Sequence, residues 1–206
     1  MNTILFSFPG NEKLTQSLAE KTGIPIGELE IRKFPDGETF AKIISEVKDC
    51  RAIIVCSLDR PDEKILPLYF ICKTLKEFGA LRVELVAPYL AYMRQDKRFH
   101  EGEAVTSDAF AALLSGFIDC MLTVDPHLHR HHSLSEIYSI PTTIIPAAEV
   151  VAGWIKNNIQ KPLLIGPDEE SGQWVKEVAK SANAPFEILF KKRKGDNDVE
   201  VSIPHV

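Results

Sequence analysis

Short apolar runs alternate with longer amphipathic segments along this chain. A continuous apolar run predicts a buried strand, whereas apolar residues at helical spacing over a longer stretch predict a helix. The expected strands are 3–8, 28–34, 39–45, 51–58, 82–90, 119–125, 142–146, 162–167, 186–191 and 199–204. The expected helices are 11–23, 61–80, 109–117, 147–158 and 168–182.

This alternation of strands and helices indicates an α/β fold with a mostly parallel sheet flanked by helices. We expect a first domain over residues 1–146 and a partial second domain over 147–206, because about sixty residues are marginal for an independent domain. Sheets of this kind bind ligands beyond the carboxyl ends of their strands. The residues that follow each strand are therefore the first place to look for a site.

Composition and charge exclude several classes of protein. Of the 206 residues, 45% are hydrophobic and 26% are charged, as in an ordinary globular protein. The net charge of −5 argues against non-specific nucleic-acid binding, which needs a basic surface. The sequence has no apolar run of roughly 18 residues for a membrane span, and its start lacks the features of a signal peptide. The four cysteines form no CxxC pair or zinc spacing, so we expect reduced thiols in a cytoplasmic protein.

Charge and histidine gather just after four of the expected strands. These strand exits are RQDKR at 94–98, PHLHRHH at 126–132, PDEES at 167–171 and KKRKGD at 191–196. Because parallel strands end at one edge of a sheet, this set favours a site for a polyanion. The sequence contains no GxxxxGK[ST] and no GxGxxG, so a phosphate would be held by side chains or by an element outside this chain.

The stretch KFPDGE at 33–38 has two interpretations. Spacing alone favours a hairpin turn, since proline and glycine both promote one. The functional interpretation makes Phe34 a stacking surface for a nucleobase, with Asp36 and Glu38 as acceptors for amino or hydroxyl groups.

RQDKR also allows a plain and a functional interpretation. A run of charges is usually a solvated loop. The alternative is a phosphate clamp, in which arginine forks bind phosphate oxygens and Asp96 orients them.

The histidines after the strand at 119–125 are candidates of unequal weight. His127 directly follows the strand and is suited to contacting a metal-bound phosphate. His129, His131 and His132 are interpreted as surface residues or as a metal cluster, although HxHxHH lacks the usual fixed partners of a zinc site.

Two further stretches complete the candidates. In GPDEES, helix capping is favoured over a water-mediated contact of Asp168 with Mg²⁺. KKRKGDND at 191–198 indicates a polar loop, or a basic flap that closes over phosphates.

The stretches KFPDGE, PYLAYMRQDKR, TVDPH, GPD and KKR, in this order and at these distances, resemble the ribose-phosphate pyrophosphokinase family along nearly the whole chain. The resemblance implies tandem α/β domains of the type I phosphoribosyltransferase kind, the second incomplete here, assembled as dimers or hexamers. It also implies a Mg²⁺-dependent enzyme that transfers the diphosphoryl group of ATP to the anomeric hydroxyl of ribose 5-phosphate. The products are 5-phosphoribosyl 1-diphosphate and AMP.

The resemblance also assigns roles to individual residues. The residues implied at the adenine and ribose of ATP are Phe34, Asp36 and Glu38. Those implied along the nucleotide and its phosphates are Arg94, Gln95, Asp96 and Arg98. Those implied at Mg²⁺ or its waters are His127 and Asp168, and those implied in catalysis are His127, Lys191 and Arg193.

The chain departs from the family's pattern in two ways. After His127 the family commonly continues with glutamine and glycine, whereas this chain reads LHRHHSLSEIYSIP, which leaves regulation by ADP or phosphate open. The family's ribose 5-phosphate loop, of the kind DDxxSTGxT, is expected beyond Val206, so we expect the chain to be inactive alone. The alternative function is a non-catalytic regulatory subunit associated with a synthetase. A phosphoribosyltransferase that consumes the product ranks last, because its own phosphoribosyl loop is not found in this sequence.

Overall fold

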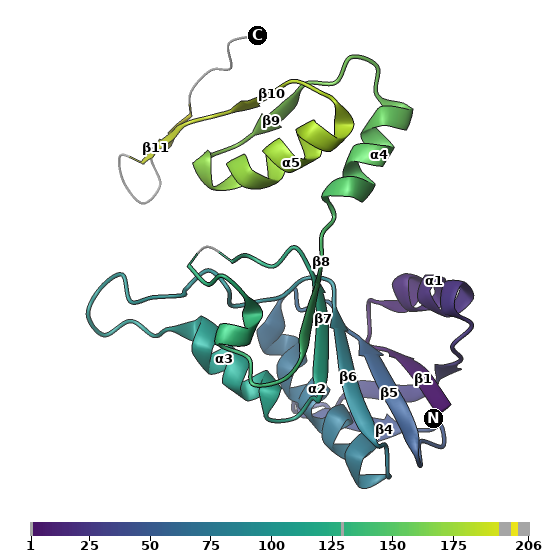
Figure 1. Ribbon diagram of the computed structural model, residues 1–206. Coiled ribbons are helices and arrows are strands. Elements are labelled where there is room, and N and C mark those ends of the chain that lie inside the picture. Colours follow the sequence, from purple (N-terminus) through teal and green to yellow (C-terminus); the bar gives the residue numbers. More distant parts are fainter. Residues whose placement is uncertain (1, 129, 194–198, 202–206) are drawn as a thin grey trace. The chain divides into compact units, whose positions relative to one another are not determined.

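The computed structural model describes residues 2–128, 130–193 and 199–201 (Figure 1). The chain forms two compact units, Met1–Ile145 and Pro146–Val206. The first unit contains a large parallel sheet with helices on both faces, and the second contains a small α/β unit of its own.

The sheet of the first unit has six parallel strands in the order β2-β1-β5-β6-β7-β8. Its strands are β1 (Asn2–Ser7), β2 (Ile26–Gly27), β5 (Cys50–Val55), β6 (Arg82–Ala87), β7 (Cys120–Val124) and β8 (Thr142–Ile145). The helices between them are α1 (Glu12–Thr22), α2 (Pro61–Glu77), α3 (Thr106–Ser115) and the short 3₁₀ helix η1 (Leu134–Glu136). The predicted α/β fold with a mostly parallel sheet is confirmed.

Both faces of this sheet are covered, which explains why its strands are continuous apolar runs. Successive residues of a strand point to opposite faces. Ile4 and Phe6 of β1 belong to the large core cluster that also holds side chains of α2 and α3. Leu5, between them, packs with Leu18 of α1 in a second cluster. Figure 1 shows α1 apart from α2 and α3.

An antiparallel hairpin follows β2 and consists of β3 (Leu29–Lys33) and β4 (Thr39–Ile43). Strand β4 packs against α2, and the two elements line an open hollow, the β4–α2 hollow, with side chains that include Tyr69, Phe70 and Lys73. The hairpin places the KFPDGE turn at its tip, between β3 and β4.

The second unit is built from a pair of parallel strands and two main helices. Its elements are α4 (Ala148–Asn158), β9 (Leu164–Gly166), the 3₁₀ helix η2 (Glu169–Ser171), α5 (Gly172–Ala182), β10 (Phe186–Ile188), β11 (Lys191–Arg193) and β12 (Val199–Val201). β9 pairs with β10 in parallel, and β11 pairs with β12 as an antiparallel hairpin. The single strand expected over 186–191 is therefore two shorter strands.

Gly166 at the end of β9 fits only because it has no side chain. A Cβ atom built there would lie 2.6 Å from the side chains of Ile188 and Ser171. This close approach lets β9, β10 and the end of η2 meet at Gly166. The glycine in GPDEES is thus needed for packing.

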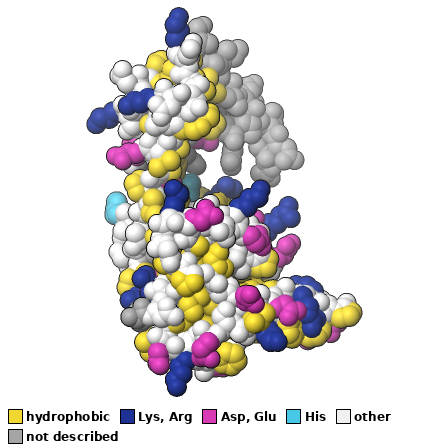
Figure 2. Space-filling view, turned by 90° about the vertical axis from the view of Figure 1, so that its right-hand side faces the viewer, with side chains coloured by type: hydrophobic (Ala, Val, Ile, Leu, Met, Phe, Trp, Pro, Cys, Tyr) yellow, Lys and Arg dark blue, Asp and Glu magenta, His cyan; other side chains and the backbone are white. Residues whose placement is uncertain are grey.

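The cysteines and the surface agree with the interpretation of an ordinary globular chain. All four cysteines are free, and burial raises the pKa of the Cys56 thiol to about 12. No helix within the described residues is both long and apolar enough to cross a bilayer. On the face shown in Figure 2, basic and acidic side chains are interspersed with apolar ones, so that face carries no field of a single sign.

Replacement of Leu85 on β6 tests how much the buried core beneath the loops contributes to stability. Its side chain is 1% exposed, whereas Leu81, just before β6, is 60% exposed. We expect Leu85→Ala to lower the free energy of unfolding by about 2–5 kcal/mol, because it leaves a cavity in a packed sheet. Leu81→Ala should change it by about 0.5 kcal/mol or less. Urea denaturation of both variants measures this, and equal losses would contradict the described core.

Candidate functional site

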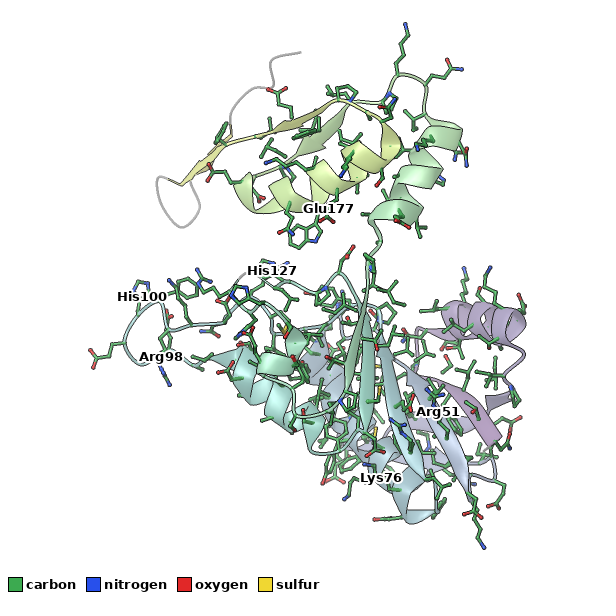
Figure 3. The ribbon with its side chains drawn as sticks, in the orientation of Figure 1. Arg51, Lys76, Arg98, His100, His127 and Glu177 are labelled. Atoms are coloured by element: carbon green, nitrogen blue, oxygen red, sulfur yellow. The ribbon has the colours of Figure 1, made fainter. Side chains whose placement is uncertain are left out.

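Two loops leave the carboxyl ends of the neighbouring strands β6 and β7. The β6–α3 loop comprises residues 88–105, and the β7–η1 loop comprises residues 125–133. The two strands pair in parallel up to Ala87 opposite Thr123, so both loops begin at the same edge of the sheet. Figure 3 shows His127 at this edge, with Arg98 and His100 on the part of the β6–α3 loop that extends away from the sheet.

The first part of the β6–α3 loop is anchored to the core. Leu90 and Met93 are buried, and the ring of Tyr92 lies 4.7 Å from the ring of Phe110 on α3. Tyr92 has a left-handed backbone with φ of 59°, and its hydroxyl donates a hydrogen bond to Asp62 on α2. The chain therefore enters the RQDKR segment from a fixed position.

Within RQDKR the charges are not equivalent. Arg94, Lys97 and Arg98 are exposed, whereas the side chain of Asp96 is 1% exposed. Oδ1 of Asp96 lies 2.6 Å from Nη1 of Arg130 in the β7–η1 loop. An ionised carboxylate is buried at large cost unless it is paired, so this ion pair accounts for the position of Asp96. The predicted contact of Asp96 with a nucleotide stays a prediction.

The ring of Phe99 makes cation–π contacts with one residue from each loop. The Nζ atom of Lys97 lies 5.0 Å from the centroid of its ring, and Cζ of Arg130 lies 5.4 Å from it. Cations at such distances are attracted to the ring electrons. Phe99 therefore adds a second contact between the β6–α3 loop and Arg130.

The outer part of the β6–α3 loop closes on Glu103. The backbone N–H groups of Phe99 and His100 donate to Oε2 of Glu103 at 2.9 and 3.1 Å, and Nε of Arg98 donates to the Glu103 carbonyl at 3.1 Å. These backbone donors, His100 first and then Phe99, hold the pKa of the Glu103 carboxyl below its usual value. The segment after RQDKR is thus a turn with its own hydrogen bonds.

The β7–η1 loop is tied to its surroundings by His131 and His132. Nδ1 of His131 lies 3.4 Å from Oε2 of Glu136, and its Nε2 lies 3.9 Å from Oδ1 of Asp108 on α3. The backbone N–H of His132 donates to Oε1 of Glu136 at 3.0 Å. Of the other two candidate histidines, His127 is half-buried at the start of this loop, and His129 lies outside the described residues. Within the described part of the chain, no group of three metal-ligating side chains is arranged to hold an ion.

The KFPDGE stretch forms the hairpin turn that its spacing favours. The backbone N–H of Gly37, which has φ of 92°, donates to the Phe34 carbonyl, and the N–H of Glu38 donates to Oδ1 of Asp36 at 3.1 Å. The Phe34 ring is 40% exposed and lies edge-on to Phe40 at 5.9 Å. The turn is confirmed, and base stacking by Phe34 stays a prediction.

Asp168 forms the helix cap that was favoured for GPDEES. Its Oδ1 accepts a hydrogen bond from the backbone N–H of Ser171 at 2.9 Å, and the Ser171 hydroxyl approaches the N–H of Asp168 in return. Asp168 belongs to the second unit and His127 to the first. A role of either residue at Mg²⁺ stays a prediction. The backbones of Lys191 and Arg193 lie on β11, and their side chains lie outside the described part of the structure.

Sequence reasoning missed Arg130 and Phe99 as parts of this arrangement. Arg130 stands among histidines in the segment that departs from the family's pattern, where nothing local marks it as a partner of Asp96. The one available signal is that their two segments follow strands that are neighbours in the sheet.

The arrangement is suited to binding an anion at the sheet edge. Arg94, Lys97 and Arg98 are exposed donors on a braced loop, and His127 stands at the start of the neighbouring loop. Charge-assisted hydrogen bonds from such donors to phosphate oxygens are among the strongest in proteins. The first unit therefore places the cations of RQDKR and His127 on two loops that begin at the same edge of the sheet.

Comparisons with known proteins show the family to which the chain belongs. A sequence profile of the N-terminal domain of ribose phosphate pyrophosphokinase matches residues 3–117. The ribose-phosphate pyrophosphokinase of Methanobrevibacter smithii is 33% identical over 95% of this chain and 65% of its own length. That of Saccharolobus solfataricus is 30% identical over 87% of this chain and 62% of its own length. The chain thus spans slightly less than two thirds of these relatives.

A solved structure shares the fold. The phosphoribosylpyrophosphate synthetase from Mycobacterium smegmatis superposes with a TM-score of 0.84 at 22% sequence identity, over 98% of this chain and 67% of that one. This likeness confirms the predicted fold of the type I phosphoribosyltransferase kind. Since the profile matches more than half of the residues, the chain belongs to the ribose-phosphate pyrophosphokinase family.

Proposed function

We propose that the protein is a ribose-phosphate diphosphokinase. In this reaction the anomeric hydroxyl oxygen of ribose 5-phosphate forms a bond to the β-phosphorus of ATP. The bond from that phosphorus to the α–β bridging oxygen breaks, AMP leaves with that oxygen, and the proton of the attacking hydroxyl is released to water. The observation that supports the proposal is the ion pair between Asp96 of RQDKR and Arg130, which joins the two loops that begin at the carboxyl edge of the sheet.

The cations of the β6–α3 loop suit the triphosphate. The guanidinium groups of Arg94 and Arg98 are exposed, and a guanidinium matches two phosphate oxygens at once. Gln95, next to Arg94, is proposed to hydrogen-bond to the nucleotide. Donors held in place before binding need little rearrangement as charge develops on the transferring group, which favours diphosphoryl transfer.

The hairpin suits the base of ATP. Phe34 keeps 40% of its surface exposed at the hairpin tip, beside the acidic residues Asp36 and Glu38. An aromatic face and two carboxylates fit adenine and a ribose with hydroxyl groups. We propose that the protein acts as a homo-oligomer, a dimer or a hexamer, in which this hairpin contributes to the nucleotide site of a neighbouring copy.

Mg²⁺ is the cofactor that the family implies, and the donors present fit it in part. Asp168 offers a carboxylate, the ligand type that Mg²⁺ prefers, and its cap to Ser171 uses only Oδ1. The imidazole of His127 suits a water or a phosphate oxygen on the ion better than the ion itself. When bound, Mg²⁺ would neutralise charge on the phosphates. Lys191 and Arg193 are proposed to stabilise the charge on the transferred group in catalysis, without a covalent protein nucleophile.

A regulatory subunit that binds nucleotide without turnover is the alternative. The relatives are longer than this chain, so the proposed activity is that of the full-length protein. We also propose that the protein is cytoplasmic. Free cysteines at all four positions are consistent with a reducing environment.

Product analysis tests the proposed activity. The full-length protein, incubated with ATP, Mg²⁺ and ribose 5-phosphate, should form AMP and 5-phosphoribosyl 1-diphosphate in equal amounts. Omitting ribose 5-phosphate or chelating Mg²⁺ should abolish AMP formation, because both substrate and ion are needed. ADP as the product would indicate a simple kinase, and ATP binding without any product would favour the regulatory subunit.

Phe34→Ala tests base stacking at the hairpin. Loss of an aromatic platform should weaken ATP binding by about 1–3 kcal/mol, with a smaller effect on ribose 5-phosphate. Phe78→Ala is the matched control, because Phe78 is an exposed phenylalanine (55%) at the end of α2. Calorimetric titration measures both ligands. Equal weakening of the binding of ATP and of ribose 5-phosphate would show that Phe34 does not stack on the base.

A further inference from the structure

Asp96 is buried in a loop whose other charges face solvent. Its side chain is 1% exposed, and its Oδ2 atom has no hydrogen-bond partner within the described part of the chain. Exposed arginines and lysine stand on both sides of it in the sequence, yet its carboxylate pairs with Arg130 of the other loop. A carboxylate enclosed in this way has little surface with which to touch a ligand. Its place in the loop is better explained by Arg130.

Arg130 reaches the β6–α3 loop at two points. Its Nη1 donates to Oδ1 of Asp96 at 2.6 Å, and its Cζ lies 5.4 Å from the centroid of the Phe99 ring. Asp96 and Phe99 stand on either side of the exposed Lys97 and Arg98. The guanidinium therefore holds both ends of the short segment that presents these two cations.

The backbone next to Arg130 is itself held in place. Arg130 precedes His131 and His132, which both contact Glu136 at the end of η1, and His131 also lies near Asp108 on α3. The loop on which Arg130 stands also begins beside β6, because β7 pairs with β6. The contact of Arg130 with Asp96, 34 residues away in the sequence, thus fixes RQDKR relative to the β7–η1 loop.

We propose that Arg130 is a positioning residue for the nucleotide site, and that Asp96 acts through it. Arg130 holds Asp96 and Phe99 so that Arg98, Lys97 and Arg94 present their donors to the phosphates. This inference rests on the proposed function for the identity of the ligand. The brace itself does not, because it concerns contacts within the first unit.

Trypsin tests the brace without any nucleotide. The full-length protein carries tryptic sites at Lys97 and Arg98, and cleavage there requires the loop to open. We expect Arg130→Ala to accelerate cleavage at these sites by about tenfold, the factor that 1.4 kcal/mol represents. Arg130→Lys, which keeps a cation near Asp96, should restore part of the protection.

Arg51→Ala is the matched control. Arg51 also pairs with a buried carboxylate, Glu84, but it stands at the start of β5, away from the loops. Figure 3 shows Arg51 low in the first unit and His127 at the opposite end. This variant should lose stability without faster cleavage at Lys97 or Arg98. Equal acceleration in Arg51→Ala and Arg130→Ala would overturn the brace, because it would reflect general loosening.

A double-mutant cycle tests the link to the ligand. The affinity for ATP with Mg²⁺ is measured by calorimetry for Arg130→Ala, Asp96→Asn and the double variant. If Asp96 acts through Arg130, each single variant should lose about tenfold and the double variant should lose little more. Losses that add would mean separate contacts with the nucleotide and would overturn the proposal. If the unaltered protein binds no ATP, the proposed function fails and the ligand role of Arg130 fails with it, while trypsin still decides the brace.

Discussion

Parallel pairing of β6 with β7 is the constraint on which the candidate site depends. The two strands pair up to Ala87 opposite Thr123, so the loops that follow them start at one edge of the sheet. One loop carries Arg94, Lys97 and Arg98, and the other carries His127 and Arg130. Residues 34 positions apart meet as an ion pair only because of this pairing. The core beneath, with side chains from α2 and α3, keeps the pairing rigid.

Most of the fold follows from local patterns that the sequence displays. The strands of the large sheet are buried on both faces and therefore show as continuous apolar runs. Gly23 ends α1 in a left-handed conformation, and Pro61 opens α2. The expected strand over 186–191 is two strands instead, because β10 pairs with β9 whereas β11 pairs with β12. These pairings join different segments of the chain, and periodicity does not reveal them.

The candidate site was predictable in its location and less so in its internal roles. Strand order placed RQDKR and His127 at a ligand-binding edge. A run of charges indicates solvent exposure, so nothing in RQDKR itself separates the buried Asp96 from its exposed neighbours. The buried carboxylate of Asp96 pairs with Arg130, which comes from another loop. The hairpin turn at Phe34 and the cap at Asp168 were predictable because their hydrogen bonds are local.

Amide hydrogen exchange with and without ATP and Mg²⁺ tests most directly whether these two loops form the nucleotide site. The method compares protection of every backbone segment in the same protein. We predict that the nucleotide slows exchange in residues 94–100 and in the β7–η1 loop from His127 onward. Protection confined to the β4–α2 hollow, with both loops unchanged at saturating nucleotide, would contradict it.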